Sequence, residues 1–359
     1  MKIGILTQPL GLNYGGILQN YALQTVLKRM GHEVWTLDVG KYRWRDWLDN
    51  AWRVLAHKLL GHNVGFALTP LQRNQLEVPL RRFVTTHIQL TAPRKNWFSR
   101  DMISKYQLDT LLVGSDQTWR PQYNKHVEDL YLQFAQGAKV HRIAYAASFG
   151  TDEWEYTDTQ TAVCAALAKQ FGAISVREQS GVKLCTEKLG VKVEHVLDPT
   201  MLLTADDYKE LCKQIPVRDP FVFAYILDAD EKKMIEIQRF ADSKQLPCVI
   251  MQANESITPD DSVEKWLSHF RDAAFVITDS FHGSVFSILF QKDLFVYKNK
   301  GRGASRFDSL FSMLKLENRY ITGPVENKEP VNWNEVSKQL VHLREHSSQW
   351  LQSNLTNNK

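Results

Sequence analysis

The stretch that decides the fold is Lys2–Leu37, which reads KIGILTQPLGLNYGGILQNYALQTVLKRMGHEVWTL. Its first apolar run, Ile3–Leu6, is short and continuous, as is typical of a parallel strand buried on both faces. Residues Gly16–Gly31 place apolar side chains on one side and basic ones on another, which predicts a helix that ends at Gly31. A second apolar run begins at Val34, so the chain opens with a β-α-β unit.

The same alternation of apolar runs and helical segments continues in two series, and Pro216 and Pro220 bracket a charged stretch between them. Buried strands that alternate with helices form parallel sheets covered on both faces. We therefore expect an α/β fold with two doubly wound, Rossmann-like domains that face a cleft. The predicted domains are residues 1–215 and 216–359, and the last helix can pack back on the first domain. The further strands are expected at Thr110–Val113, Ile143–Ala147, Ala173–Val176, Val193–Leu197, Phe221–Leu227, Cys248–Met251, Phe275–Thr278 and Leu294–Tyr297.

Composition argues against several classes of protein. The 359 residues carry 44 Lys and Arg against 40 Asp and Glu, a net charge of +4 with no basic run, so we expect no nucleic-acid partner. The four cysteines form no C-x-x-C pair, which is typical of reduced thiols in a cytoplasmic protein. No stretch has the roughly 18 uncharged apolar residues of a membrane span, and the run Met1–Leu6 is too short for a signal peptide.

The segment Lys41–His62 differs in character from the rest of the first domain. Its tryptophans and leucines recur at helical spacing while its basic residues point elsewhere; the apolar set is Trp44, Leu48, Trp52, Leu55 and Leu59. Such a helix would suit a peripheral contact with the inner face of the membrane. A surface helix packed on the core fits the same pattern and is the commoner case.

Two short motifs resemble metal sites but have simpler interpretations. His342-Leu-Arg-Glu-His346 matches the zinc pattern H-x-x-E-H, yet only 13 residues follow it to supply a third ligand, so an exposed helix explains it better. Asp228-Ala-Asp230 resembles the D-x-D of some glycosyltransferases, but an Asp that caps the next helix explains it better. We expect no metal. The absence of G-x-S-x-G, Walker and G-x-G-x-x-G motifs counts against a serine hydrolase, a P-loop NTPase and a dinucleotide oxidoreductase.

Three polar clusters follow predicted strands of the first domain, where a doubly wound sheet binds its ligands. Asn13-Tyr-Gly-Gly16 offers glycines for close backbone approach and a helix start that attracts anions, although a plain tight turn explains it equally well. In Gly114-Ser-Asp-Gln-Thr-Trp119 the indole ring and its polar neighbours suit a sugar, and an Asx turn beside a packing Trp is the alternative. Arg177 can fork onto a phosphate or carboxylate, or form an ion pair with Glu178.

A fourth cluster, Thr278-Asp-Ser-Phe-His-Gly-Ser284, brings a carboxylate, hydroxyls and an imidazole to a strand end that opens a helix over Val285–Phe290. Because imidazole titrates near neutral pH, His282 can give or take a proton, although a lone His is usually structural. The segment that follows carries several cations around Gly301 and Gly303, and it would either close over an anion or remain a solvated loop. These cations are Lys298, Lys300, Arg302 and Arg306.

Taken together, these segments resemble the polysaccharide pyruvyltransferase family from Lys2 to about Tyr320. The resemblance implies a GT-B-like arrangement, with the acceptor on the N-terminal domain and the donor on the C-terminal one. It also implies that enolpyruvate moves from phosphoenolpyruvate to two hydroxyls of one sugar, which leaves a cyclic pyruvate ketal and phosphate. The motifs that carry the resemblance are Asn13–Gln24, Gly114–Trp119, Ser175–Glu178, Leu197-Asp-Pro199, Asp279–Gly283 and Ser305-Arg-Phe307.

The resemblance also implies roles for single residues. His282 corresponds to the motif histidine and is the expected general acid–base group, and Asp116 is the expected catalytic carboxylate that orients the acceptor. One position departs from the family, which often has an Arg two residues before the histidine where this chain has Ser280. The departure removes a cation from the expected anion site. The expected donor-binding residues are Arg177, Arg306, Arg302, Ser280 and Gly283, and the expected acceptor-binding residues are Asn13, Gly15, Gly16, Gln117 and Trp119.

The function that follows is ketal pyruvyl transfer onto a bacterial surface-polysaccharide precursor, of exopolysaccharide or capsule, in the cytoplasm or at the inner membrane face. The expected partners are phosphoenolpyruvate as co-substrate and a saccharide acceptor, free or lipid-linked, with no further cofactor. Two alternatives stay open: a GT-B-type glycosyltransferase with a nucleotide-sugar donor, and a non-catalytic sugar-binding homologue.

Overall fold

The structure, a computed structural model, describes residues 1–40, 48, 51, 52, 54, 69–92, 94–252, 258, 261–299 and 303–356. Most of the Trp- and Arg-rich segment 41–62 lies outside the described residues, as do Lys300 and Arg302 of the predicted cationic loop. None of the helices in the described ranges is long and apolar enough to cross a membrane.

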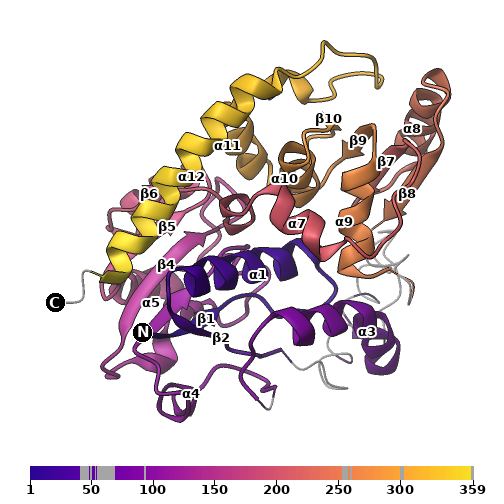
Figure 1. Cartoon of the computed structure of the whole chain (residues 1–359). Helices are drawn as coiled ribbons and strands as arrows, with labels where there is room; N and C mark the ends of the chain where they lie inside the picture. Colours follow the sequence, from indigo (N-terminus) through magenta and orange to yellow (C-terminus); the bar gives the residue numbers. More distant parts are fainter. Residues whose placement is uncertain are drawn as a thin grey trace.

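The first domain is built on a six-stranded parallel sheet with the strand order β2-β1-β3-β4-β5-β6 (Figure 1). The strands are β1 (Lys2–Leu6), β2 (Glu33–Thr36), β3 (Thr110–Val113), β4 (His141–Ala147), β5 (Ala173–Val176) and β6 (Glu194–His195). The helices are α1 (Tyr14–Arg29), α3 (Pro70–His87), α4 (Asp101–Lys105), η1 (Val127–Tyr131), η2 (Gln133–Ala135), α5 (Asp158–Ala168), α6 (Gln179–Leu184), the π-helix η3 (Cys185–Leu189), η4 (Pro199–Leu202) and α7 (Ala205–Leu211).

The second domain has a four-stranded parallel sheet with the order β10-β9-β7-β8. Its strands are β7 (Val222–Ile226), β8 (Cys248–Gln252), β9 (Phe275–Thr278) and β10 (Asp293–Val296). Its helices are α8 (Glu231–Ser243), α9 (Val263–Asp272), α10 (Phe281–Leu289), α11 (Ala304–Leu314), η5 (Glu317–Arg319) and α12 (Trp333–Thr356). Two parallel sheets with helical crossovers confirm the predicted α/β class with two Rossmann-like domains.

The last helix, α12, leaves the second domain and runs back along the first one (Figure 1). The Leu197 N–H, just after β6, donates a hydrogen bond of 3.0 Å to Ser347 Oγ on α12. Arg344 Nε donates to the Met201 carbonyl in η4 at 2.8 Å. The predicted domain boundary at residues 215 and 216 lies between α7 and β7, so the chain passes from the first domain to the second and returns at α12.

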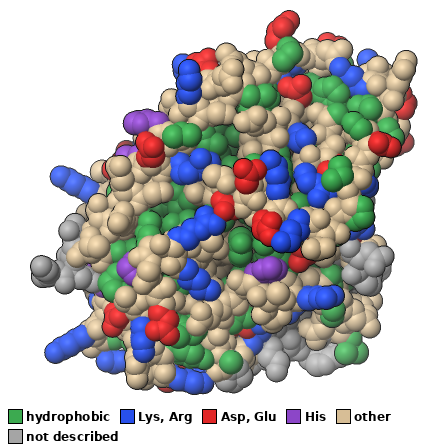
Figure 2. Space-filling view, viewed as in Figure 1, with side chains coloured by type: hydrophobic (Ala, Val, Ile, Leu, Met, Phe, Trp, Pro, Cys, Tyr) green, Lys and Arg blue, Asp and Glu red, His purple; other side chains and the backbone are tan. Residues whose placement is uncertain are grey.

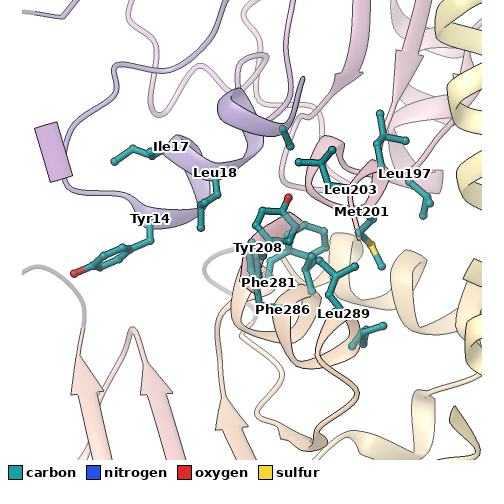
Figure 3. Close-up of a cluster of buried hydrophobic side chains, with 14 of the residues drawn as sticks. Tyr14, Ile17, Leu18, Leu197, Met201, Leu203, Tyr208, Phe281, Phe286 and Leu289 are labelled. Carbon is teal, nitrogen blue, oxygen red and sulfur yellow. The ribbon is translucent and has the colours of Figure 1, made fainter. Parts of the chain in front are cut away.

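The two domains share one apolar core at the point where they meet (Figure 3). Tyr14, at the start of α1, stacks on Trp266 of α9 with ring centroids 5.4 Å apart. Its hydroxyl donates to the Asp261 carbonyl at 3.0 Å. Close by, Tyr208 of α7 meets Phe286 of α10 edge to face at 4.9 Å. Because burial of apolar surface drives packing, this shared core fixes how the strand ends of the two sheets face each other.

Charge is mixed in sign on the face of the molecule that Figure 2 views. Figure 2 shows acidic and basic side chains interspersed with hydrophobic ones on the face that it views. This pattern agrees with the small net charge of +4 and gives that face no large basic patch of the kind that binds nucleic acid.

Packing of α12 on the first domain predicts a stability effect. Leu351 is completely buried, so Leu351→Ala should lower the free energy of unfolding by about 2–5 kcal/mol, measured by urea denaturation. The neighbouring Gln352 is exposed, and Gln352→Ala should change the free energy by less than about 0.5 kcal/mol. A Leu351→Ala variant as stable as its control would mean that α12 does not belong to the core.

Candidate active site

A cavity of about 180 Å³ lies between the carboxyl ends of the two sheets. Ends of parallel strands are where doubly wound domains place their ligands, because the loops and helix starts there are free to carry polar groups. The cavity is lined by residues of both domains, so its wall depends on how the two domains pack together. The polar and charged groups in its wall are Asn13, Asp116, Gln117, Tyr123, Tyr225, Asp279, Ser280, His282 and Arg306.

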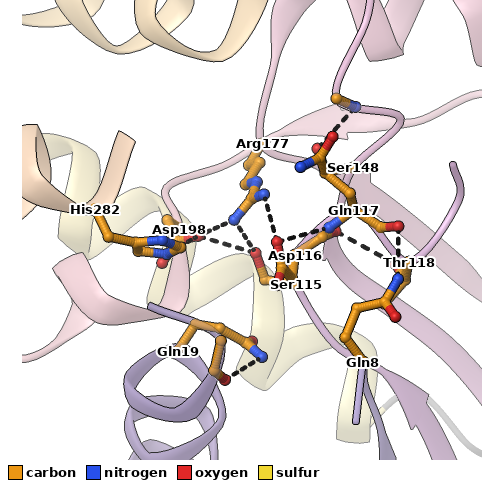
Figure 4. Close-up of polar contacts among 12 residues, drawn as sticks. Gln8, Gln19, Ser115, Asp116, Gln117, Thr118, Ser148, Arg177, Asp198 and His282 are labelled. Atoms are coloured by element: carbon orange, nitrogen blue, oxygen red, sulfur yellow. Dashed lines mark hydrogen bonds and ion pairs between the residues drawn. The ribbon is translucent and has the colours of Figure 1, made fainter. Parts of the chain in front are cut away.

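Next to this cavity the side chain of Arg177, which follows β5, is completely buried among acidic groups (Figure 4). Its Nη1 donates to Asp198 Oδ2 at 2.6 Å and to Ser115 Oγ at 3.1 Å. Its Nη2 donates to Asp116 Oδ1 at 3.3 Å, and its Nε lies 4.0 Å from Glu178 Oε2. A buried charge is stable only when opposite charges surround it, so Arg177 ties together the segments that follow β3, β5 and β6.

Asp198, which follows β6, is the other centre of this network. Its Oδ2 accepts hydrogen bonds from Arg177 and, at 2.9 Å, from Ser115 Oγ. Its Oδ1 accepts from the N–H and hydroxyl of Thr200 at 3.0 and 2.7 Å. Burial alone would raise the pKa of the Asp198 carboxyl, but the adjacent His282 imidazole and the charge of Arg177 outweigh burial and hold this pKa well below its usual value.

The His282 ring stands between Asp198 and the start of α1. Its Nε2 is 3.7 Å from Asp198 Oδ2, so the carboxylate is placed to stabilise positive charge on the ring. On the other side the ring lies directly against the backbone at Gly15, where an added Cβ would come within 1.9 Å of His282 Nδ1. Gly15 therefore positions the imidazole by leaving room for it.

Asp116 presents its carboxylate to the cavity from a left-handed backbone conformation, with φ of 75°. This conformation is unfavourable for a residue with a side chain and persists where neighbouring contacts impose it. Here Arg177 and the Asn13 side chain, whose Nδ2 donates to Asp116 Oδ2 at 3.3 Å, hold the carboxylate in place. Asn13 in turn caps α1, because its Oδ1 accepts from the Gly16 N–H at 3.1 Å.

Arg306, on the first turn of α11, brings a buried positive charge to the cavity wall. Its guanidinium lies 5.3 Å from the ring centroid of Phe281. Burial and the charge of Arg177 lower the pKa of Arg306 to about 10, although Asp116 and Glu178 act in the opposite direction. Negative charge from a ligand would stabilise this cation, so the cavity is suited to an anion.

Gly303, which precedes α11, brings that helix against the first domain. A Cβ at Gly303 would approach the Gly150 carbonyl oxygen to 2.1 Å, and both glycines have positive φ. The Gly150 N–H donates to Glu178 Oε1 at 3.3 Å. Burial raises the pKa of the Glu178 carboxyl, against the opposing charges of Arg177 and Arg306. This backbone contact sets the depth to which Arg306 enters the site.

Two of the predicted ligand contacts are wrong. The Trp119 ring, expected to face a sugar, is completely buried, stacks on Tyr131 at 4.5 Å and donates its Nε1–H to the Leu130 carbonyl at 3.0 Å. Arg177, expected to grip the donor, has no exposed side-chain surface and is held by carboxylates of the protein itself. Both residues support the wall of the site instead of contacting a ligand.

The remaining predicted residues that the structure describes fall into two groups. His282, Asp116, Asn13, Gly15, Gln117, Ser280 and Arg306 all line the cavity. Gly16 and Gly283 have local roles, because the Gly16 N–H serves the Asn13 cap and a Cβ at Gly283 would approach Thr278 Oγ1 to 2.3 Å. Gly283 therefore permits close packing of α10 on β9. Arg302 lies outside the described residues.

Several residues of the site are not among the predicted catalytic or ligand-binding residues. Asp198, Ser115 and Glu178 belong to the buried network, and Asp279 holds β7 beside β9 by accepting from the Leu227 and Asp228 N–H groups at 2.6 and 3.0 Å. Each follows a predicted strand, which is the signal that could have found them. Asp198, directly after the predicted strand Val193–Leu197, is the clearest case.

The two metal-like motifs have structural roles. Asp230 caps α8, because its Oδ1 accepts from the Lys233 N–H at 2.8 Å. His342 and His346 lie on α12, and His346 Nε2 is 3.5 Å from Glu194 Oε1. Within the described part of the chain, no three His, Cys, Asp or Glu side chains gather in a way that could hold a metal ion.

Comparison with solved structures places the fold. The chain is similar to the UDP-GlcNAc 2-epimerase from Neisseria meningitidis bound to UDP-GlcNAc, with 12% identity, a TM-score of 0.53 and coverage of 100% of both chains. It is also similar to a putative UDP-N-acetylglucosamine 2-epimerase from Listeria monocytogenes, with 11% identity, a TM-score of 0.50 and coverage of 98% of this chain and 90% of that one. These similarities establish a GT-B-type fold, as predicted.

The family model described as polysaccharide pyruvyl transferase matches residues 13–300. The chain belongs to this family, as its six motifs predicted, and the family is one of transferases. The match includes the segments that carry Asn13, Asp116, Arg177, Asp198 and His282, whereas Arg306 lies beyond it. A comparison with curated proteins gives no match.

The buried Arg177–Asp198 pair predicts a pH-dependent stability difference. Asp198→Asn removes one partner of a buried ion pair and should lower the free energy of unfolding by about 3–5 kcal/mol at neutral pH. Because the pKa of Asp198 is lowered by folding, its contribution is present above the unfolded pKa of about 4 and is lost as the pH falls through the folded pKa. Urea denaturation should show a constant gap between wild type and variant from neutral pH to about pH 5, which narrows below about pH 4.

Asp206 provides the control, because its side chain is 87% exposed. Asp206→Asn should change stability by less than about 1 kcal/mol at any of these pH values. A gap for Asp198→Asn that stays constant throughout the acidic range would contradict the ionised state of Asp198.

Proposed function

We propose that the protein transfers enolpyruvate from phosphoenolpyruvate to two hydroxyls of one sugar in a surface-polysaccharide precursor, forming a cyclic ketal and phosphate. The observation that carries the proposal is the meeting of His282, backed by Asp198 at 3.7 Å, with Arg306 in one cavity wall. A proton-transfer group beside a buried cation is what protonation of an anionic enol phosphate requires. Membership of the polysaccharide pyruvyl transferase family supports the same reaction class.

Anion binding rests on fewer side chains than the family motif implies. Where the family often has an Arg, Ser280 accepts a hydrogen bond from the Gly283 N–H at 3.2 Å and caps α10. The first turn of α10 nevertheless lines the cavity through Ser280, Phe281 and His282, so the positive end of the helix dipole faces it. Arg306 and this helix start would together hold the phosphate and carboxylate of the donor.

The acceptor would enter from the first domain. Asp116, Asn13 and Gln117 line the cavity on that side and offer hydrogen-bond acceptors and donors for a pair of neighbouring hydroxyls. Because Arg177 and Asn13 fix the Asp116 carboxylate, that group can orient a hydroxyl oxygen toward the donor without itself having to be ordered on binding.

In the proposed reaction, protonated His282 gives its proton to the methylene carbon of phosphoenolpyruvate, and the adjacent carbon becomes an oxocarbenium-like electrophile. One sugar hydroxyl bonds to that carbon and returns its proton to the imidazole. The oxygen of the second hydroxyl then bonds to the same carbon as the bond to the phosphate oxygen breaks. Phosphate leaves with the electron pair of that bond and takes up the proton that the second hydroxyl releases. Asp198 stabilises the positive charge that forms on the ring each time it holds the proton.

Donor binding is tested by thermal or urea unfolding of the purified protein. Phosphoenolpyruvate at 100 times its Kd should add about 2.7 kcal/mol to the free energy of unfolding, and Arg306→Met should remove that gain. Arg239→Met, which changes an exposed Arg on α8, should leave the gain intact. Stabilisation by UDP or GDP and not by phosphoenolpyruvate would replace the proposal with the nucleotide-sugar glycosyltransferase.

The role of His282 is tested by turnover, measured as phosphate release in the presence of a saccharide acceptor. His282→Ala should lower kcat by roughly 10²–10⁴-fold, because it removes the proton-transfer group, while the unfolding transition stays cooperative. His342→Ala, on the exposed face of α12, should turn over like the wild type. Equal turnover of both variants would remove His282 from the mechanism.

A further inference from the structure

The aromatic ring of Phe281, the first residue of α10, lies among the cationic groups of the site. The guanidinium carbon of Arg177 is 5.1 Å from the centroid of this ring, and that of Arg306 is 5.3 Å from it. The imidazole of His282, which is positive whenever it holds the proton of the proposed reaction, has its centroid 5.3 Å away, with the two ring planes at 78°. Three groups that carry or accept positive charge therefore surround one ring.

Positive charge on Arg306 is costly at this place. Burial and the neighbouring charge of Arg177 both lower the pKa of Arg306, and Asp116 and Glu178 act in the opposite direction. Those carboxylates also serve Arg177, because Asp116 Oδ1 is 3.3 Å from its Nη2 and Glu178 Oε2 is 4.0 Å from its Nε. Since two cations share the same carboxylates, a further source of negative potential stabilises Arg306.

The ring of Phe281 is such a source. The face of an aromatic ring carries negative partial charge and attracts a cation within about 6 Å of its centroid, more strongly where water is excluded. Phe281 and Arg306 are each only 5% exposed, so water screens this contact little. A carboxylate in the place of the ring would neutralise the guanidinium and repel an anionic ligand. A neutral ring stabilises the cation and leaves its charge available to the ligand.

The position of the ring is fixed by apolar packing. Phe281 belongs to the core that the two domains share (Figure 3). It also meets Phe307 edge to face, with centroids 5.9 Å apart and planes at 88°. Phe307 follows Arg306 on α11, so this contact joins the helix that carries His282 to the helix that carries Arg306. Phe281, Phe307, His282 and Arg306 all line the cavity.

We propose that Phe281 is a positioning residue for anion binding, whose ring face holds the charged Arg306 guanidinium in the cavity wall beside Arg177. It acts on the ligand through Arg306, and its contribution depends on the electron density of the ring and not on apolar packing alone. The inference rests on the proposed function only for the identity of the anion, which there is phosphoenolpyruvate.

The experiment varies the charge of the ring face without changing its shape. The full chain is prepared with mono-, di- or trifluorophenylalanine at position 281, because fluorine withdraws electron density from the ring and weakens its attraction for a cation. The Kd values for inorganic phosphate and for phosphoenolpyruvate are measured by titration calorimetry. Both Kd values should rise stepwise with each added fluorine, by about tenfold over the whole series.

A double-mutant cycle tests whether the ring acts through Arg306. Phe281→Leu keeps an apolar side chain and removes the ring, so it should raise the Kd for both anions by about tenfold or more. In an Arg306→Met background the same change should have little further effect, because the cation that the ring stabilises is absent. An equal effect of Phe281→Leu in both backgrounds would show that the ring contributes packing alone and would overturn the inference.

Phe311 provides the matched control, because its completely buried ring lies on the same helix as Arg306 and stacks on Tyr320 with centroids 4.9 Å apart. The fluorinated series at position 311 should leave both Kd values unchanged. Constant Kd values across the series at position 281, or equal changes at both positions, would also overturn the inference. A wild type that binds phosphate but not phosphoenolpyruvate would reject the proposed donor, and the phosphate series would still decide the role of Phe281. A wild type that binds neither anion would overturn both.

Discussion

The arrangement of the active-site loops depends on one buried guanidinium, that of Arg177. Arg177 would be strongly destabilising in the protein interior without opposite charges, and Asp198, Asp116 and Glu178 supply them from segments that follow three different strands. The requirement works in both directions, because those carboxylates also need the cation. The positions of the loops at this edge of the first sheet are therefore set by one electrostatic constraint, with apolar packing beneath it.

This constraint extends into the second domain through two contacts. Asp198 faces the His282 ring at 3.7 Å, and Glu178 holds the Gly150 backbone that meets Gly303 at the start of α11. His282 and Arg306 are thus positioned by carboxylates of the other domain. Glycine at positions 15, 150 and 303 leaves the space that these approaches need.

Much of the fold could be predicted from the sequence because buried parallel strands are continuous apolar runs: β5 and β9 match their predicted ranges. Two helix starts differ from their predicted positions. The helix predicted from Gly16 begins at Tyr14, and the one predicted from Val285 begins at Phe281, because Asn13 and Ser280 supply caps. A run of apolar residues locates a helix face, whereas the cap depends on backbone geometry.

The sequence predicted where the site residues lie more reliably than it predicted what each of them contacts. Polar clusters after strands located His282, Asp116 and Arg306 correctly in the cavity wall. Which Arg lines the cavity and which is enclosed by carboxylates depends on contacts between distant segments, so the sequence could not separate Arg177 from Arg306. Trp119 was misassigned for the same reason, since its polar neighbours are in the site while its ring packs on Tyr131.

The return of α12 to the first domain has a consequence for synthesis of the protein. Besides the hydrogen bonds of Ser347 and Arg344 to the first domain, α12 contributes Leu351 and Leu355, which are fully buried. The first domain therefore completes its packing only after the residues of α12 have been made. A domain that begins at the N-terminus normally folds while the rest of the chain is still being translated. Here the nascent first domain must wait, with an apolar surface exposed, until the second domain has left the ribosome.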